Sequence, residues 1–154
     1  MAVNKTSIYL ILLLCIMLTV KAQKSTKWTD CSYYSKPVKD LAISGCNVNE
    51  CRLKQKTKVK ASIVFQSPAN TNFVKPWLCV WLSIFKYCKA FDPPNDNACN
   101  FMNPGCPLVK NRVYNASMEV TVPEHDYDNT GRFYLYDGTK SEMVCVDVRV
   151  VISA

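Results

Sequence analysis

The chain has 154 residues, including nine cysteines and only four glycines, and its formal net charge is +7. Hydrophobic residues make up 49% of it, which is enough for a packed core and excludes disorder as a general description. The low glycine count excludes a collagen-like chain. From Lys24 to Ala154, no apolar run is long enough to cross a bilayer. Nine is an odd number of cysteines, so at least one of them needs a separate explanation.

The N-terminal segment Met1–Ala22 has the features of a secretory signal peptide. Lys5 supplies a positive charge, the apolar run Ser7–Val20 follows, and Val20 and Ala22 occupy the two positions that signal peptidase reads. An uncleaved membrane anchor is the alternative, but the apolar run is shorter than the roughly 20 residues that a span needs. The sequence therefore predicts cleavage after Ala22.

The segment that remains after cleavage, residues 23–154, is predicted to be a single domain, because it contains no low-complexity linker and no internal repeat. Cleavage removes Cys15 and leaves eight cysteines, which form disulfides by default in the oxidising secretory route. The sequon that begins at Asn115 predicts N-glycosylation of a secreted protein. The sequence leaves open whether the protein stays outside the cell or reaches the lysosome.

The segments of regular structure alternate apolar and polar residues with a period of two, which is typical of β-strands. Turn clusters rich in Gly, Pro, Asn and Asp separate them. About seven short strands, with no convincing helix, predict an all-β fold, an immunoglobulin-like antiparallel β-sandwich. In chain order, the clearest segments are Lys58–Phe65, Trp77–Tyr87, Lys110–Val122, Arg132–Tyr136 and Val144–Ile152.

The segment Trp77–Tyr87 is apolar on both faces, which is expected for a strand that is buried on both sides. Trp77, Trp81 and Phe85 are spaced by four residues, so a helical stripe is the alternative interpretation. The abundance of Val, Ile and aromatic residues favours the strand.

Six of the remaining cysteines follow an ordered pattern, in which the fifth precedes a proline and the sixth lies within an alternating valine strand. With this pattern, the chain from about Lys27 to Ser153 resembles the lipid-recognition ML family, most closely its Niemann–Pick type C sterol-carrier branch and secreted arthropod relatives. The resemblance implies a sandwich that holds a lipid in a hydrophobic cavity between its two sheets. The six cysteines are Cys31, Cys46, Cys51, Cys99, Cys106 and Cys145.

The disulfide pairing that the resemblance implies is Cys31 with Cys145, Cys46 with Cys51, and Cys99 with Cys106. In a loop-entropy model, the closure between Cys31 and Cys145 contributes about 4–5 kcal/mol of stability, since it encloses nearly the whole domain. The two other bridges close short loops and mainly shape turns.

Cys79 and Cys88 depart from the pattern of the family. In one extended strand they would lie roughly 30 Å apart, whereas a disulfide needs Cα atoms within about 7 Å. They are therefore either free buried thiols or a fourth bridge across a hairpin centred near Leu82–Ile84, and the sequence leaves both possibilities open.

The resemblance also implies ligand-binding residues. Phe91 matches a pocket aromatic of the family, Val122 a pocket valine, and Tyr127, with a one-residue insertion, a tyrosine at the rim. We expect the loops Phe73–Trp77 and Phe91–Asn97 to form the rim of the opening. The alternation of apolar residues adds candidates for the cavity wall: Ile63, Phe65, Leu82, Ile84, Val146 and Val148.

Catalysis has little support in the sequence, because a Ser/His/Asp or Cys/His site would have to use the single histidine, His125, which lies between acids in a loop. The spacing of the cysteines is not that of a zinc site, and no glycine-rich phosphate loop is present. We therefore expect neither enzyme activity, nor a metal, nor another cofactor. Nucleic-acid binding is not expected, because no nucleic-acid module is recognisable.

Basic residues recur at every second position between Arg52 and Lys60, so in an extended segment their charges share one face. One interpretation is a solvated strand face that discourages edge-to-edge pairing. The other is transient contact with anionic membranes, since each basic side chain near such a surface contributes about 1 kcal/mol. The basic residues are Arg52, Lys54, Lys56, Lys58 and Lys60.

Two functions are compatible with these features. The first is a secreted monomeric carrier that holds a sterol, a fatty acid or a similar apolar lipid between its sheets. The second is a lipid-sensing recognition protein, such as an innate-immune co-receptor, without transport activity. Transfer of a sterol between vesicles distinguishes them, because only a carrier accelerates it.

Overall fold

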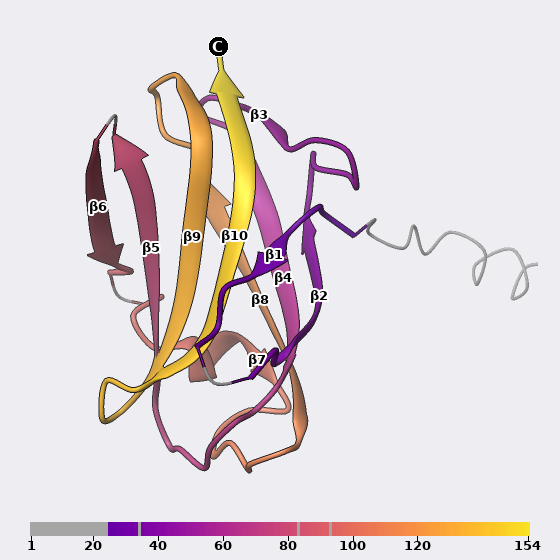
Figure 1. Cartoon of the computed structure of the whole chain (residues 1–154), viewed down its shortest axis with the longest axis vertical. Coiled ribbons are helices and arrows are strands. Elements are labelled where there is room, and N and C mark those ends of the chain that lie inside the picture. Colours follow the sequence, from indigo (N-terminus) through magenta and orange to yellow (C-terminus); the bar gives the residue numbers. More distant parts are fainter. Residues whose placement is uncertain (1–24, 34, 83, 93) are drawn as a thin grey trace, which may run out of the picture.

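The computed structural model describes residues 25–33, 35–82, 84–92 and 94–154 as two β-sheets that face each other (Figure 1). The predicted signal peptide and Cys15 lie outside these residues. The first sheet has the strand order β1-β10-β9-β5-β6, with β3 also paired to β10, and the second has the order β2-β4-β8-β7. All of these pairings are antiparallel except that of β3 with β10. The predicted antiparallel sandwich is therefore confirmed.

Seven strands of six or more residues account for about half of the described chain, and their number agrees with the one predicted from the sequence. They are β2 (Val38–Ile43), β4 (Lys58–Gln66), β5 (Val74–Leu82), β6 (Phe85–Ala90), β8 (Val113–Thr121), β9 (Tyr127–Asp137) and β10 (Glu142–Ser153). Three shorter strands are β1 (Thr29–Asp30), β3 (Arg52–Lys54) and β7 (Met102–Asn103), and a single 3-10 turn, η1, spans Ala98–Phe101. Within the described ranges, no helix is long and apolar enough to cross a membrane.

The core lies between the sheets and is built from the alternating residues of the long strands. Phe65 of β4, Tyr114 of β8 and Leu135 of β9 are each at most 1% exposed. The hydroxyl of Tyr114 accepts a hydrogen bond from the backbone N–H of Val109 at 2.7 Å, so burial of this tyrosine leaves its polar atom paired. A second, smaller cluster contains Val59, Val122 and Ile152.

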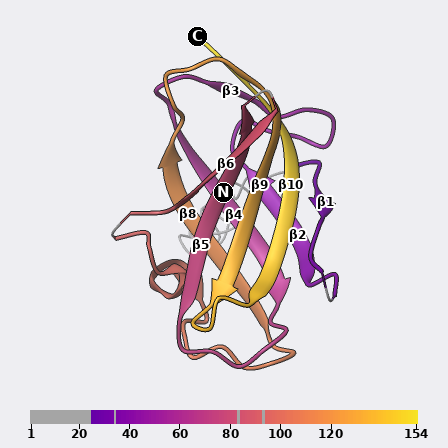
Figure 2. The ribbon, with the colours of Figure 1, turned by 60° about the vertical axis from the view of Figure 1, so that its left-hand side comes forward.

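The segment Trp77–Tyr87 is neither one strand nor a helix but most of an antiparallel hairpin, β5–β6, at the edge of the first sheet (Figures 1 and 2). The choice of strand over helix is confirmed, whereas the expected burial of both faces is wrong. Leu82, Ile84 and Phe85 are 53%, 85% and 71% exposed. The reason is that β6 is an edge strand, so its hydrophobic residues do not lie in the middle of a covered sheet.

The same hairpin brings together the two cysteines that the family pattern leaves unassigned. Cys79 and Cys88 stand directly opposite each other in β5 and β6, with Cα atoms 4.0 Å apart, and form a disulfide. The fourth bridge, rather than two free thiols, is therefore present. The remaining bridges are Cys31–Cys145, Cys46–Cys51 and Cys99–Cys106, the pairs that the family resemblance implies.

The basic segment between Arg52 and Lys60 does not form one continuous face. It is divided between β3 of the first sheet and β4 of the second, and Lys56 in the turn between them has φ = 60°. Three of its basic side chains form surface ion pairs with neighbouring acids, which supports the interpretation as a solvated face. These pairs are Arg52–Glu50, Lys56–Glu124 and Lys58–Glu119.

Candidate functional site

The sandwich has one side where inward-pointing apolar residues remain exposed. Leu78 of β5 lies directly opposite Phe133 of β9, which packs against the main core, so Leu78 belongs to the inner face of the first sheet. Leu78 is nevertheless 42% exposed. By register, Lys89 and the apolar residues Val80, Leu82, Phe85 and Tyr87 share this face of the hairpin. We call Leu78 and these four apolar residues the open inner face.

The facing strands of the second sheet show the same departure from full burial. On β4 and β8, Ile63 and Ala116 form a buried pair, whereas the next inward pair, Ala61 and Met118, is only partly buried. Val120, one step further along β8, is also partly buried. Both sheets thus present incompletely covered apolar residues along the side where β8 faces the β5–β6 hairpin.

The turn η1 closes the adjacent part of this side, because it contacts both β5 and β8 and buries Ala98 completely. Phe91, in the loop that leads from β6 to η1, packs edge-on against Phe133 with ring centroids 6.2 Å apart. Its backbone N–H donates to the carbonyl of Pro76. Phe91 therefore lies at the border between the closed and the open part, and its role as a ligand-binding residue stays a prediction.

The other candidate residues fall into three groups. Ile63, Phe65, Val146 and Val148 belong to the main core cluster and are at most 7% exposed. Leu82 lies on the open inner face. Ile84 is not a wall residue, because it sits in the hairpin turn with 85% of its surface exposed.

Val122 and Tyr127 lie at the second core cluster. The hydroxyl of Tyr127 donates to the carbonyl of Thr130 at 2.7 Å and accepts from the backbone N–H of Trp81 at 3.2 Å. Burial raises the pKa of Tyr127 above its ordinary value. The hydrogen bond from Trp81 ties the end of β5 to β9, and the ring of Tyr127 packs against the second core cluster.

Residues of the open side that sequence reasoning missed are Leu78, Val80, Met118 and Phe133. The cysteine spacing contained the missing signal: if Cys79 pairs with Cys88 across a hairpin, both sulfurs point to one face, and Leu78 and Val80 must point to the other. The expected rim segment Phe73–Trp77 is wrong in part, because Phe73 and Trp77 line a groove on the outer face.

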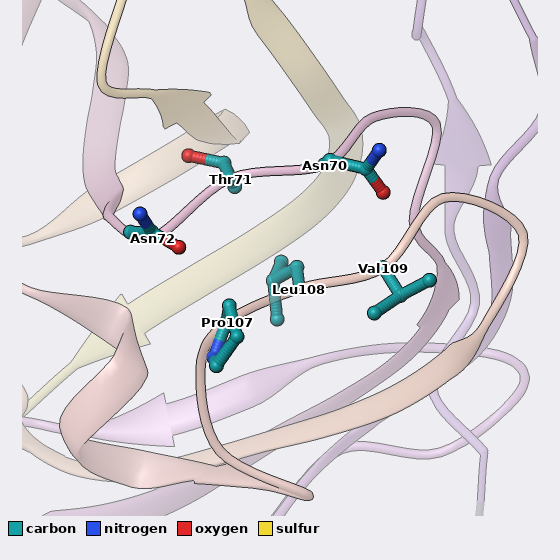
Figure 3. Close-up of a pocket in the computed structure, with 6 residues that line it drawn as sticks. All are labelled: Asn70, Thr71, Asn72, Pro107, Leu108 and Val109. Carbon is teal, nitrogen blue, oxygen red and sulfur yellow. The ribbon is translucent and has the colours of Figure 1, made fainter.

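Two hollows on the described surface lie outside the space between the sheets. One, of about 470 Å³, is lined by two loops that Thr71 and Leu108 join through reciprocal backbone hydrogen bonds (Figure 3). The backbone N–H and carbonyl groups of Thr71 and Leu108 are paired with each other, so they do not offer hydrogen bonds to a ligand. The second, of about 440 Å³, lies on the outer face of the first sheet. The enclosed inter-sheet cavity therefore stays a prediction.

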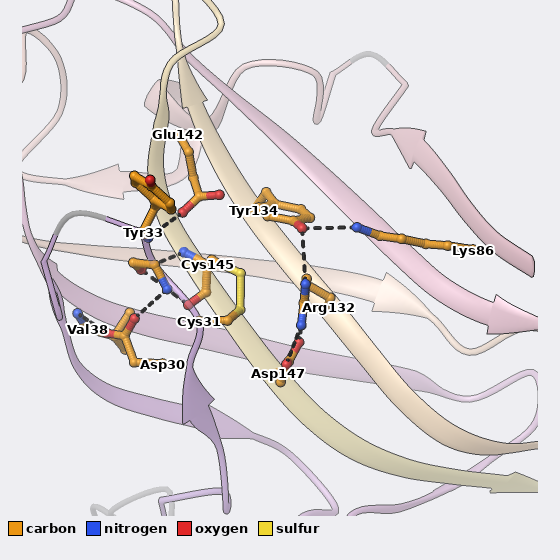
Figure 4. The surroundings of a disulfide bond; sticks show 11 residues. Asp30, Cys31, Tyr33, Val38, Lys86, Arg132, Tyr134, Glu142, Cys145 and Asp147 are labelled. Carbon is orange, nitrogen blue, oxygen red and sulfur yellow. Dashed lines mark hydrogen bonds and ion pairs between the residues drawn. A yellow bond between two sulfur atoms is a disulfide. The ribbon is translucent and has the colours of Figure 1, made fainter.

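On the outer face, a polar network crosses β9 and β10 beside the Cys31–Cys145 bridge (Figure 4). Arg132 donates to both carboxylate oxygens of Asp147, at 2.6 and 2.8 Å, and its guanidinium lies 5.1 Å from the ring of Trp81. The hydrogen bonds to Asp147 raise the pKa of Arg132. The pair is mostly shielded from solvent and holds the two longest strands in register.

Replacing Arg132 by lysine should lower the free energy of unfolding by about 1–2 kcal/mol, because an ammonium group cannot form the two-pronged contact or stack on Trp81. Urea denaturation measures the change. Arg149→Lys is the matched control, since its pair with Asp128 is exposed and should cost less than about 0.5 kcal/mol. Equal losses in both variants would contradict a special role of Arg132.

Comparisons with known proteins agree with this architecture. The family model described as ML domain matches residues 25–152. A Niemann-Pick type C2 protein from Japanese carpenter ant superposes with a TM-score of 0.67 at 17% identity, over 82% of this chain and 98% of that chain. Chicken MD-1, solved in complex with lipid IVa, gives a TM-score of 0.51 at 12% identity, over 78% of this chain and 83% of that chain. A search of curated proteins found no match. Since the family model covers most of its length, the chain belongs to the ML domain family.

Proposed function

We propose that this protein binds a small apolar lipid between its two sheets and admits it through the side where β8 faces the β5–β6 hairpin. The observation that carries the proposal is the exposure of inward-facing apolar residues on both sheets, such as Leu78 and Met118. Exposed contiguous apolar surface on a soluble domain marks an interaction site. Membership of the ML domain family and the lipid IVa bound to chicken MD-1 support the same ligand class.

The binding energy would come from the hydrophobic effect. Each Å² of apolar surface removed from water contributes about 25 cal/mol, so a ligand that buries a few hundred Å² gains several kcal/mol before the costs of association. The residues of the open inner face include no histidine, cysteine or acid that could act as a catalytic group. His125 lies in an exposed loop. We therefore propose a binding protein rather than an enzyme.

Among apolar ligands, we favour a sterol or a fatty acid and a role as a carrier. Ile84 and Phe85, at the turn of the β5–β6 hairpin, are exposed to solvent, so they can enter the headgroup region of a bilayer while the open side lies next to it. A recognition protein without transport is the alternative, for which the likeness to MD-1 is the supporting observation.

The experiment that tests the proposal has two stages. Native mass spectrometry of protein purified from a secretory host should show a bound lipid, and a fluorescent sterol or fatty acid should bind to delipidated protein. Vesicle-to-vesicle transfer of that probe should then be faster in the presence of the protein. Absence of both bound lipid and probe binding would overturn lipid binding, whereas binding without faster transfer would overturn only the carrier.

Replacing Ile84 by aspartate should slow transfer between vesicles by about tenfold but leave binding of the soluble probe unchanged. The reason is that a charge at the hairpin turn opposes insertion into the bilayer without facing the ligand. Val48→Asp is the matched control, because Val48 is also an exposed aliphatic residue, 60% exposed in a distant loop. Equal transfer rates for the two variants would rule out the hairpin turn as the membrane contact.

We also propose that the protein is a secreted monomer, either extracellular or lysosomal. Four disulfides join all eight cysteines of the predicted mature domain, which fits folding in an oxidising compartment.

Asn115 is exposed on β8, and its side-chain carbonyl accepts a hydrogen bond from Ser62 at 2.8 Å. Glycosylation at Asn115 stays a prediction that a mass shift on glycosidase treatment would test.

A further inference from the structure

The groove of about 440 Å³ on the outer face of the first sheet is distinct from the open inner face, because it is lined by the alternate residues of the same strands. Its residues come from β5, β6, β9 and the turn after β9, so that a rigid sheet forms its floor. The residues that matter for recognition are Lys75, Trp77, Lys86, Tyr134, Tyr136 and Lys140.

The floor of this outer groove is aromatic. Trp77 meets Tyr136 edge-on with ring centroids 6.4 Å apart, and Tyr136 stacks on Tyr134 at 5.3 Å. The Cys79–Cys88 disulfide lies beside these rings and belongs to the same lining. Aromatic rings offer a flat apolar body a large contact area at a low cost in conformational entropy.

The rim of the outer groove carries three lysines, none of which forms an ion pair with a described residue. Lys75, Lys86 and Lys140 form no ion pair within the described chain, whereas Arg52, Lys56, Lys58, Lys89, Arg132 and Arg149 all do. The amine of Lys86 is held in place, because it donates to the hydroxyl of Tyr134 at 3.1 Å and lies over the rings of Tyr134 and Trp81 at 5.1 and 5.4 Å.

The carboxylate of Asp137 also lines the outer groove, but it is already hydrogen-bonded within the turn that follows β9. One of its oxygens accepts hydrogen bonds from the hydroxyl and the backbone N–H of Thr139 and from the backbone N–H of Ser141. Burial alone would raise the pKa of Asp137, yet these hydrogen bonds outweigh it and the pKa is lowered. Glu142, directly opposite Tyr136 in β10, is a second acid beside the outer groove, and it accepts a hydrogen bond from the backbone N–H of Tyr33. Three lysines therefore face two carboxylates, both of which already accept hydrogen bonds.

From this arrangement we infer that the outer groove binds a small organic anion with a planar apolar body, such as an aromatic carboxylate. The flat body rests on Trp77 and Tyr136, and the carboxylate forms charge-assisted hydrogen bonds with the lysine ammonium groups of the rim, Lys75 and Lys140 at one end of the groove and Lys86 at the other. A site of this volume, mostly apolar with positive charges at its rim, has the character of a small-molecule pocket. The site is independent of the proposed lipid site on the inner face.

A test uses 2-naphthoate as the probe and its uncharged analogue 2-naphthalenemethanol for comparison, both by titration calorimetry with the mature protein. 2-Naphthoate should bind at least tenfold more tightly than the alcohol. In the triple variant Lys75→Gln, Lys86→Gln, Lys140→Gln, its affinity should fall at least tenfold. The control triple variant Lys39→Gln, Lys54→Gln, Lys110→Gln removes the same charge elsewhere on the exposed surface and should bind like the unmodified protein.

Amide NMR shifts locate the probe, and should move at Gly138 and Lys140 in the groove. The variant Leu78→Asp separates the two sites, because it changes only the inner face and should leave naphthoate binding intact. No binding of 2-naphthoate, equal affinity in both triple variants, or loss of binding in Leu78→Asp alone would overturn the inference. Binding to vesicles of anionic phospholipid without binding of the soluble probe would overturn it too, in favour of a membrane surface.

Discussion

Replacing Cys31 and Cys145 together by serine should lower the free energy of unfolding by about 4–5 kcal/mol. The bridge joins residues separated by 114 positions, and in a loop-entropy model the loss grows with the logarithm of that separation. The bridge also anchors β1, and Ser32, close to the end of β1, accepts a hydrogen bond from the backbone N–H of Cys145 at 2.9 Å. Guanidinium denaturation, monitored by tryptophan fluorescence, measures the change.

The matched control is the double variant Cys79→Ser, Cys88→Ser, which removes another bridge but over a separation of only 9 residues. The same model gives a loss of about 3 kcal/mol for it. Both variants bury hydroxyl groups in place of sulfur, so their difference reports the length of the closed loop. If the control lost as much stability as the first variant, the long closure would not be the source of the effect.

Leu78→Asp should weaken binding of an apolar lipid probe at least tenfold while the protein stays folded. Leu78 points to the inner face but is 42% exposed, so the free protein can hydrate an aspartate there. A bound lipid would remove that charge from water, and the leucine contact worth about 1.5–3 kcal/mol would be lost as well. Probe fluorescence titration measures the affinity, and the far-ultraviolet circular dichroism spectrum checks the fold.

Val113→Asp controls for the chemical nature of this substitution. Val113 is an aliphatic strand residue with 50% exposure, but it precedes the inward-facing Tyr114 and therefore points away from the core of the second sheet. Its replacement should leave the affinity for the lipid unchanged. A similar loss of affinity in both variants would show that the probe binds nonspecifically, and no loss in Leu78→Asp would remove the open inner face from the site.

Much of the fold could be predicted because alternation specifies which residues share a face. The alternation predicts that Val144, Val146, Val148, Val150 and Ile152 share one face of a strand; in β10 four of them are buried and Val150 is partly buried. The phase of the alternation does not show where a strand turns back. Between Trp77 and Tyr87 no glycine or proline marks the turn. The sequence of this segment is therefore compatible with a hairpin, a single strand or a helix.

The candidate site was predicted less well, because burial depends on what lies above a strand. Leu82 and Phe65 both look like core residues in the sequence, yet Leu82 is 53% exposed and Phe65 is completely buried. Phe65 lies in β4, between two strands of its sheet, whereas Leu82 ends β5 next to an edge strand. A sequence lists hydrophobic residues but does not give the position of a sheet edge.

The sequence by itself determined most strand positions, the cysteine order and the resemblance to the family, since these depend on local alternation and on fixed spacings along the chain. Only the tertiary structure decided that Cys79 pairs with Cys88, that the open side lies between β8 and the β5–β6 hairpin, and that the lysines around Trp77 share one groove. These features arise from the pairing of strands far apart in the chain. The register and the edges of a sheet are set by contacts across the whole molecule, which a period of two does not encode.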